Sequence, residues 1–156
     1  MIGEPSQVIG RPLFRMQLSI GTIMTIGGPP GNQTRLATIA GGTFEGDRLQ
    51  GVVRAGGTDW QRVRADGSVL LDARIVLETH TGALIAMSYM GIRTGPPDVM
   101  VSLDRGEIVD PQRYYFRIMP TFSTADTALD WLNHIIGIGV GDRLPEGPTY
   151  AVHEIR

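Results

Sequence analysis

The chain has 156 residues, a size that suits one domain with a hydrophobic core of its own. Its formal net charge of −2 argues against nucleic acid as the main partner, because phosphate binding normally needs a basic patch. The sequence contains no cysteine, which excludes disulfides, thiolate catalysis and cysteine metal sites.

Glycine and proline are frequent, with 21 and 10 residues, and they separate short β-type runs. This punctuation favours an all-β domain. No run approaches the roughly 18 apolar residues of a membrane-spanning helix, and the N-terminus lacks the basic start and apolar block of a secretion signal. We therefore expect a cytoplasmic protein that binds no membrane, with a flexible N-terminal arm over residues 1–10.

The first half of the chain predicts strands separated by glycine-rich turns. Residues 11–20 alternate, and Phe14, Met16, Leu18 and Ile20 share one apolar face. Further strands are expected over residues 34–40, 48–54 and 60–64, with a loop at 27–33 and a tight turn at 65–68.

The most regular alternation runs from Val69 to His80. One face is apolar, whereas Asp72, Arg74 and Glu78 lie on the other, and a turn at residues 81–82 leads into a second hairpin strand over 83–92. The remaining segments predict short helices over 98–105 and 124–133 and strands over 114–122, 134–140 and 149–155. Nine or ten strands in one sheet would curl. The sequence therefore predicts an all-β domain over residues 1–156, a single closed or nearly closed antiparallel β-barrel, lipocalin-like in shape, with one or two short helices.

Several familiar kinds of site are not indicated. His80, His134 and His153 are far apart and lack paired spacing, so surface imidazoles are a better interpretation than a metal site. The glycine-rich stretches "GGPPGN" and "GIGVGDR" do not continue into the lysine of a phosphate-binding loop. We expect no metal and no organic cofactor.

What remains is a set of polar and aromatic side chains on strands, suited to a cavity that binds a small-molecule ligand. If the charged face of residues 69–80 looks into the lumen, Asp72 and Arg74 point inward. The alternative is a structural role, in which Asp72 forms a salt bridge with Arg74 or Arg117 on an exposed face or in a filled barrel.

The motifs then resemble a known family, domain of unknown function 3237, also called uncharacterised protein family 0311. The resembling stretches run in the family's order across nearly the whole chain: residues 41–53, 56–74, 81–97, 110–124, 130–143 and 150–155. The resemblance implies a β-barrel that assembles into homo-oligomers, a dimer or larger. It implies no settled biochemical activity.

Asp59 and Trp60 begin a strand directly after Gly56 and Gly57. In one interpretation Asp59 makes a turn hydrogen bond and Trp60 plugs one end of the barrel. In the other, Trp60 lies at a cavity mouth and Asp59 is a proton acceptor, its pKa raised by apolar surroundings. Tyr115 and Arg117 would then stabilise an oxygen anion on the substrate.

The candidate site follows from that second interpretation. Its expected catalytic residues are Asp59, Asp72, Tyr115 and Arg117. Its expected substrate-binding residues are Phe44, Trp60, Arg74, Arg93, Trp131 and Asn133. The function would be that of a cofactor-independent isomerase, hydratase or lyase acting on a small aromatic or carbonyl compound. A non-catalytic ligand-binding barrel, or a structural barrel plugged by Phe44, Trp60, Tyr115 and Trp131, is the alternative.

Overall fold

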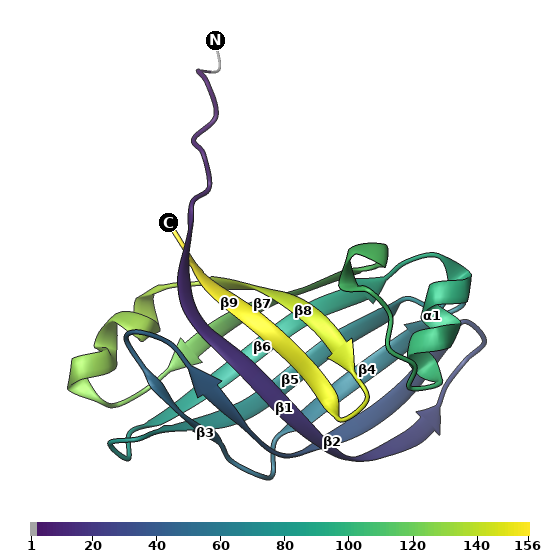
Figure 1. Cartoon of the computed structure of the whole chain (residues 1–156), viewed down its shortest axis with the longest axis horizontal. Coiled ribbons are helices and arrows are strands. Elements are labelled where there is room, and N and C mark those ends of the chain that lie inside the picture. The colour runs from purple at the N-terminus through teal and green to yellow at the C-terminus, as the bar shows by residue number, and fades with distance from the viewer. Residues whose placement is uncertain (1–2) are drawn as a thin grey trace.

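Nine antiparallel strands make up most of the chain in the computed structural model, which describes residues 3–156 (Figure 1). Their bounds are β1 Gly10–Gly27, β2 Asn32–Glu45, β3 Gln50–Val53, β4 Thr58–Arg64, β5 Val69–Thr79, β6 Leu84–Thr94, β7 Tyr115–Ser123, β8 Gly137–Leu144 and β9 Gly147–Ile155. The helices are α1 Pro97–Asp104 and the 3-10 helices η1 Pro111–Arg113 and η2 Thr127–His134.

The sheet closes on itself through β1. This strand pairs with β9 along one edge and with β2 along the other, and β2 continues through β4 to β5. The C-terminal end of β2 pairs instead with the short β3, which in turn pairs with β5. The predicted all-β fold, a closed or nearly closed antiparallel barrel with short helices, is therefore confirmed.

The expected elements occur in the expected order, and the main differences in length are at β2, which covers Asn32–Glu45 rather than residues 34–40, and at β1. This strand extends to Gly27, beyond the predicted end at Ile20, because the β1–β2 ladder continues past irregularities near Ser19, Ile20 and Ile23. The second predicted helix is the 3-10 helix η2, in which the Asp126 carboxylate accepts hydrogen bonds from the amides of Ala128 and Leu129 at 3.0 and 3.2 Å.

The expected N-terminal arm covers residues 1–10, of which Met1 and Ile2 lie outside the described residues. Residues 3–9 are exposed and have no regular secondary structure, and Gly10 already belongs to β1. None of the helices within residues 3–156 has the length and apolar composition needed to cross a membrane.

The barrel buries the apolar face of its strands. On β5, Leu71, Ala73, Ile75 and Leu77 are almost fully buried, whereas the residues between them face solvent. Burial of an aliphatic side chain contributes about 1.5–3 kcal/mol. A barrel with the apolar face of its strands inside is therefore strongly favoured over one with the polar face inside.

Two groups of aromatic rings fill much of the interior. Phe14 packs against Phe44 and Phe122, with ring centroids 5.4 and 6.2 Å apart. Tyr150 packs edge-on against Tyr89 at 5.7 Å and Phe116 at 5.3 Å. The second group includes two tyrosines, so it brings hydroxyl groups into the interior of the barrel.

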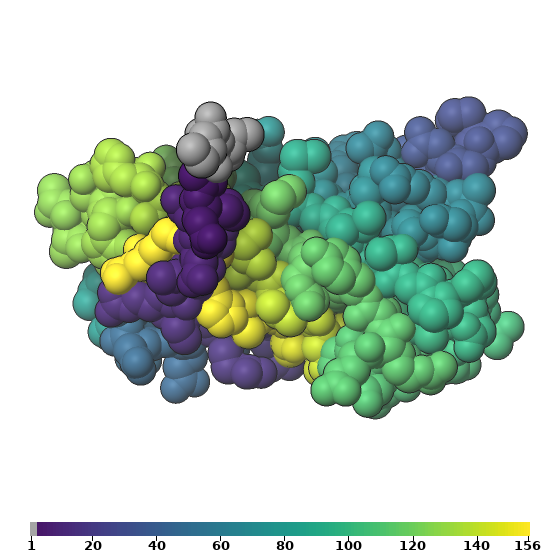
Figure 2. Space-filling view, turned by 90° about the horizontal axis from the view of Figure 1, so that it is seen from above, coloured from purple at the N-terminus to yellow at the C-terminus, as the bar shows by residue number. Residues whose placement is uncertain are grey.

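The helical segments lie at opposite ends of the barrel. Figure 2 shows the segment that contains α1 at one end of the molecule and the segment that contains η2 at the other. Pro97 starts α1 at a position where a missing amide proton costs little. Its buried residues Val99, Met100 and Leu103 pack onto the core, so α1 closes one end of the barrel.

Gly42 should be intolerant of any side chain. Its φ is +155°, and an added Cβ would lie 2.2 Å from the carbonyl oxygen of Gln17 on β1. We expect Gly42→Ala to lower the free energy of unfolding by about 2 kcal/mol, measured by urea denaturation. Gly82→Ala is the control, because Gly82 also has a positive φ, +88°, but has no atom within 4 Å of an added Cβ. It should cost about 1 kcal/mol. Equal losses would mean that the contact with Gln17 does not matter.

Candidate functional site

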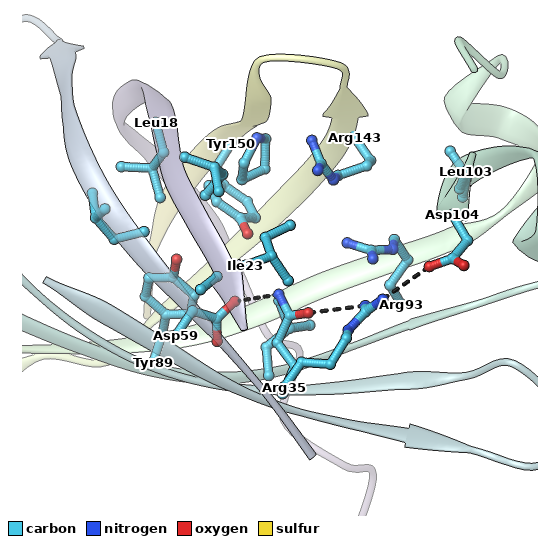
Figure 3. A pocket seen from close by; sticks show the side chains of 16 residues that line it. Leu18, Ile23, Arg35, Asp59, Tyr89, Arg93, Leu103, Asp104, Arg143 and Tyr150 are labelled. Carbon is cyan, nitrogen blue, oxygen red and sulfur yellow. Dashed lines mark hydrogen bonds and ion pairs between the residues drawn. The ribbon is translucent and has the colours of Figure 1, made fainter. Parts of the chain in front are cut away.

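A cavity of about 70 Å³ lies inside the barrel near α1 (Figure 3). Its wall combines aliphatic side chains with an unusual number of polar ones. The polar lining consists of Arg35 on β2, Asp59 and Gln61 on β4, Tyr89 and Arg93 on β6, Asp104 on α1, Arg143 on β8 and Tyr150 on β9. These segments are far apart in sequence and meet only because the sheet closes.

One chain of hydrogen bonds crosses the cavity wall. The Arg35 guanidinium donates to Asp104 at 2.8 Å and to the side-chain oxygen of Gln61 at 3.0 Å. The Gln61 amide nitrogen donates to Oδ2 of Asp59 at 2.8 Å, and Oδ1 of Asp59 accepts from the backbone amide of Asp72 at 3.2 Å. Because Arg35 can only donate, the chain fixes the orientation of Gln61 and directs a donor to the Asp59 carboxylate.

Asp59 is the chemically distinctive residue of this wall. It is 4% exposed, and burial raises the pKa of its carboxyl group above the ordinary value of 3.8. The hydrogen bonds from Gln61 and from the Asp72 amide, together with the charge of Arg93, oppose that rise. A buried carboxyl group with a raised pKa is suited to accept or return a proton.

The two tyrosines supply neutral donors next to Asp59. Burial raises the pKa of Tyr150, and it raises the pKa of Tyr89 well above its usual range, so both phenols stay protonated at neutral pH. Among residues 3–156 the Tyr150 hydroxyl is buried without a hydrogen-bond partner. Figure 3 shows the hydroxyls of Tyr89 and Tyr150 pointing toward the same part of the cavity as Asp59.

The ion pair between Arg35 and Asp104 stands where the cavity meets the surface. A groove of about 450 Å³ beside α1 shares Arg35, Arg93, Leu103 and Asp104 with the cavity wall. The Asp104 side chain is 70% exposed and that of Arg35 is 18% exposed. Because the Asp104 carboxylate is largely exposed, solvent screens this pair, which contributes about 0–1 kcal/mol. Its opening would join the cavity to the groove at a low energetic cost.

Of the ten residues expected at the site, Asp59 and Arg93 line the cavity. The expectation that Asp72 and Arg74 point inward is wrong, because both are exposed on the outer face of β5, where the apolar residues between them occupy the interior. Asp72 also forms no ion pair with Arg74 or Arg117 within residues 3–156.

Tyr115 and Arg117 also lie away from the cavity, on the outer side of β7. Tyr115 is 52% exposed, and the Arg117 guanidinium lies 4.7 Å from the centre of its ring. Arg117 also donates to the carbonyl of Phe116 at 2.9 Å. The strand alternation explains this placement. Phe116 and Ile118, which alternate with Tyr115 and Arg117 on β7, are fully buried.

The other expected substrate-binding residues have structural surroundings. Phe44 belongs to the aromatic core, and Trp60 is 48% exposed on the outer face of β4, so it neither plugs the barrel nor lies at the cavity mouth. Trp131 lies under the Arg48 guanidinium at 4.4 Å. Asn133 is exposed and fixes the chain at Thr124, whose amide donates to it at 2.8 Å. The proposed plug of four aromatic residues is therefore wrong for Trp60 and Tyr115, whereas Phe44 lies in the core and Trp131 packs against it.

Sequence reasoning missed Arg35, Gln61, Tyr89, Arg143 and Tyr150. A signal existed for three of them, because each alternates in step with apolar neighbours on an inward face. Tyr89 follows Ile85 and Met87, Tyr150 precedes Val152, and Arg35 precedes Ala37 and Ile39. Within the described part of the chain, no group of three or more His, Asp or Glu side chains is arranged to hold a metal ion.

The raised pKa of Asp59 predicts a pH dependence of stability. The folded protein holds this proton more tightly than the unfolded chain. Its stabilising contribution is therefore complete below the ordinary pKa of 3.8 and is lost as the pH rises through the higher folded pKa. Asp59→Asn removes that titration. We expect the stability of the wild type relative to Asp59→Asn to fall as the pH rises above 3.8 in urea unfolding. A constant difference would contradict the raised pKa.

Together these features define a nine-stranded antiparallel β-barrel protein with a small, polar, partly enclosed cavity at one end. Over residues 10–155 the sequence matches the family described as "Protein of unknown function (DUF3237)". The chain belongs to this family, as its sequence motifs indicated.

Relatives agree with this assignment. A UPF0311 protein of Rhodopseudomonas palustris is 32% identical over 143 residues, which cover 92% of this chain and 94% of that protein. The crystal structure of a beta-barrel like protein from Acinetobacter baumannii has a TM-score of 0.85 and 32% identity, covering 98% of this chain and 99% of the other. The crystal structure of an enzyme from Penicillium herquei has a TM-score of 0.77 at 22% identity and covers 100% of both chains. At that identity the likeness concerns the fold.

Proposed function

We propose that the cavity binds a small carbonyl or aromatic compound and acts on it by acid–base chemistry, without an organic cofactor or a metal. The activity would be that of an isomerase, hydratase or lyase. The observation that carries this proposal is the buried Asp59 carboxyl group, whose pKa burial raises, on the wall of a cavity that the Tyr150 hydroxyl also lines. The Penicillium enzyme supports it only to the extent that the same fold can serve catalysis.

The chemistry would divide between two groups. Asp59 takes a proton from a carbon next to the ligand's carbonyl group. The electron pair of that C–H bond forms a C=C bond to the carbonyl carbon, and the π pair of the C=O bond moves onto the oxygen. The Tyr150 hydroxyl, which has no hydrogen-bond partner among the described residues, forms a hydrogen bond to this oxygen as its negative charge develops. The proton then returns from Asp59 to the same or a neighbouring position, which restores both side chains.

The size of the cavity limits the ligand. Sites for drug-sized molecules usually have volumes of about 300–1,000 Å³, so about 70 Å³ suits a compound with few non-hydrogen atoms. A larger aromatic compound would extend into the groove beside α1 and would have to displace the pair between Arg35 and Asp104. A small carbonyl compound is therefore the ligand class that the geometry favours.

Proton exchange with deuterated water tests this function directly. Acetone, pyruvate and acetophenone would be incubated with the protein in D₂O, and loss of the hydrogens next to each carbonyl would be followed by proton NMR. We expect accelerated exchange in at least one of the three. If compounds bind, as seen from chemical-shift changes in the protein, but none exchanges faster than in buffer, the chain is a non-catalytic binding barrel.

We further propose that the protein assembles with copies of itself, as the family resemblance implies. A row of outward-facing side chains across neighbouring strands supports this proposal. Trp60, Met90 and Met119 lie in register on β4, β6 and β7, with the exposed Asp72 of β5 between Trp60 and Met90, and each of the three is about half exposed. Light scattering would measure the mass in solution, and a mass near 16.9 kDa would rule out an assembly.

A cytoplasmic location stays a prediction from the sequence.

A further inference from the structure

Arg93 is a buried charge that has no ion-pair partner among residues 3–156. Its side chain is on β6 inside the barrel, and the residue is 6% exposed. Within residues 3–156 it forms no ion pair, and its Nε atom is buried without a hydrogen-bond partner. The guanidinium lies over the Phe116 ring, whose centre is 5.2 Å from the guanidinium carbon. A buried charge is costly unless it is paired, so this guanidinium calls for a partner.

The surroundings of Arg93 add positive charge. Arg143 on β8 lines the same cavity, forms no ion pair among the described residues, and donates to the carbonyl oxygen of its neighbour Leu144. Figure 3 shows the guanidinium groups of Arg93 and Arg143 extending from their strands into the cavity. Burial and the charge of Arg143 both lower the pKa of Arg93, to about 10.

The acids on the cavity wall do not balance these charges. Asp104 is already paired with Arg35 at 2.8 Å. Asp59 accepts from Gln61 and from the Asp72 amide, and its distance from Arg93 exceeds that of an ion pair. Two guanidinium groups without an ion-pair partner among residues 3–156 therefore face a small, partly enclosed volume.

We propose that the ligand of this cavity is a small organic carboxylate, and that Arg93, assisted by Arg143, binds its carboxylate group. The planar fork of a guanidinium matches the two oxygens of a carboxylate, and such paired hydrogen bonds are strong where water is excluded. The placement of the ligand's reacting carbonyl group rests on the proposed function. A short keto acid would place its carboxylate at Arg93 and its carbonyl oxygen at the Tyr150 hydroxyl, and the carbon that loses a proton would face Asp59.

Matched pairs of probes test the charge preference on the wild-type protein. Acetate would be compared with acetamide, and pyruvate with pyruvamide, because each pair has nearly the same shape but differs in charge. Dissociation constants would be measured by NMR titration at constant ionic strength. We expect each carboxylate to bind about tenfold more tightly than its amide. Equal affinities within either pair, or tighter binding of inorganic phosphate than of both carboxylates, would overturn the proposal.

Variants then locate the preference. Arg93→Gln should reduce the ratio of amide to carboxylate dissociation constants to near one, and Arg93→Lys should retain part of it, because lysine keeps the charge without the fork. The control is Arg62→Gln, which removes the same charge from the outward face of β4 and should leave the ratio unchanged. Circular dichroism would establish that each variant is folded. An unchanged ratio in folded Arg93→Gln would contradict the assignment, and so would a drop in Arg62→Gln.

The two proposals fail in different ways. If the carboxylates bind preferentially but no probe exchanges hydrogen in D₂O, the carboxylate site stands and the catalytic function fails. If acetone exchanges as fast as pyruvate and the charge preference is absent, the catalytic function stands and the carboxylate site fails.

Discussion

Asp59→Asn should abolish proton exchange while the protein keeps its fold and its ligand. Asparagine has the shape of aspartate but cannot accept a proton from carbon, so the accelerated exchange should fall by about 10²–10⁴-fold. Its side-chain oxygen can still accept from the Asp72 amide, as Oδ1 of Asp59 does at 3.2 Å. Since Arg93 remains in place, affinity for a carboxylate should change little. Exchange in D₂O and NMR titration of the same ligand would measure the two effects separately.

Asp72→Asn is the matched comparison. Asp72 was the other acid that the sequence suggested, but its side chain is exposed on the outer face of β5, and only its backbone amide contacts Asp59. We expect exchange by Asp72→Asn to equal that of the wild type. If Asp72→Asn loses activity and Asp59→Asn retains it, the cavity near α1 is not the reacting site. If Asp59→Asn loses ligand affinity and exchange to the same extent, Asp59 binds rather than reacts.

The fold was accessible from the sequence because its information is local. Strands such as β5 alternate over many residues, and glycine-rich turns mark their ends, so the number and order of strands follow from periodicity. Closure then follows from the size of the sheet. The extra length of β1 was not accessible, because Gly21 to Gly27 pairs with β2 through contacts between distant residues rather than through a pattern of its own.

The side of the sheet that faces inward was harder to assign for the site. Alternation separates Asp72 and Arg74 from Leu71 and Ala73, but it does not say which set lies inside. The hydrophobic effect decides this at β5, since an aliphatic face outweighs any benefit of enclosing charges. The same argument, applied to β6, would have placed Arg93 inside, because it shares a face with Ile85 and Met87.

At β4 the pattern is ambiguous. Asp59 and Gln61 share one face, and Trp60 lies on the other. A tryptophan usually favours the buried side, yet here Trp60 is half exposed and the two polar residues lie inside. Local pattern fails at this point because the burial of Asp59 depends on Arg35, Gln61 and the Asp72 amide, which come from three strands. Such a departure from hydrophobic patterning is expected at a functional site.

Replacing Arg93 with methionine should make the protein more stable, although the change removes the positive charge and all the hydrogen-bond donors of the side chain. Burial and the neighbouring positive charge lower the pKa of Arg93 to about 10, which corresponds to a penalty of roughly 3 kcal/mol for the charged form. The contact with the Phe116 ring offsets only about 0.5–2 kcal/mol. Methionine fills a similar volume without a charge, and exchanging buried charges for apolar side chains can add about 1–4 kcal/mol. We expect a gain toward the upper half of that range in urea unfolding.

Arg48→Met provides the opposite case. Arg48 pairs with Glu154 at 2.8 Å and covers Trp131 at 4.4 Å, so its loss should lower the free energy of unfolding by about 1 kcal/mol. If Arg93→Met also destabilises the protein, Arg93 has a structural partner and the case for a bound anion weakens. If Arg93→Met is more stable but no longer distinguishes acetate from acetamide, the buried guanidinium is a cost that the fold carries for the sake of binding. An unpaired buried charge lowers the stability of the free protein, and a bound ligand of opposite charge would restore it. This property distinguishes a binding site from an ordinary part of a barrel core.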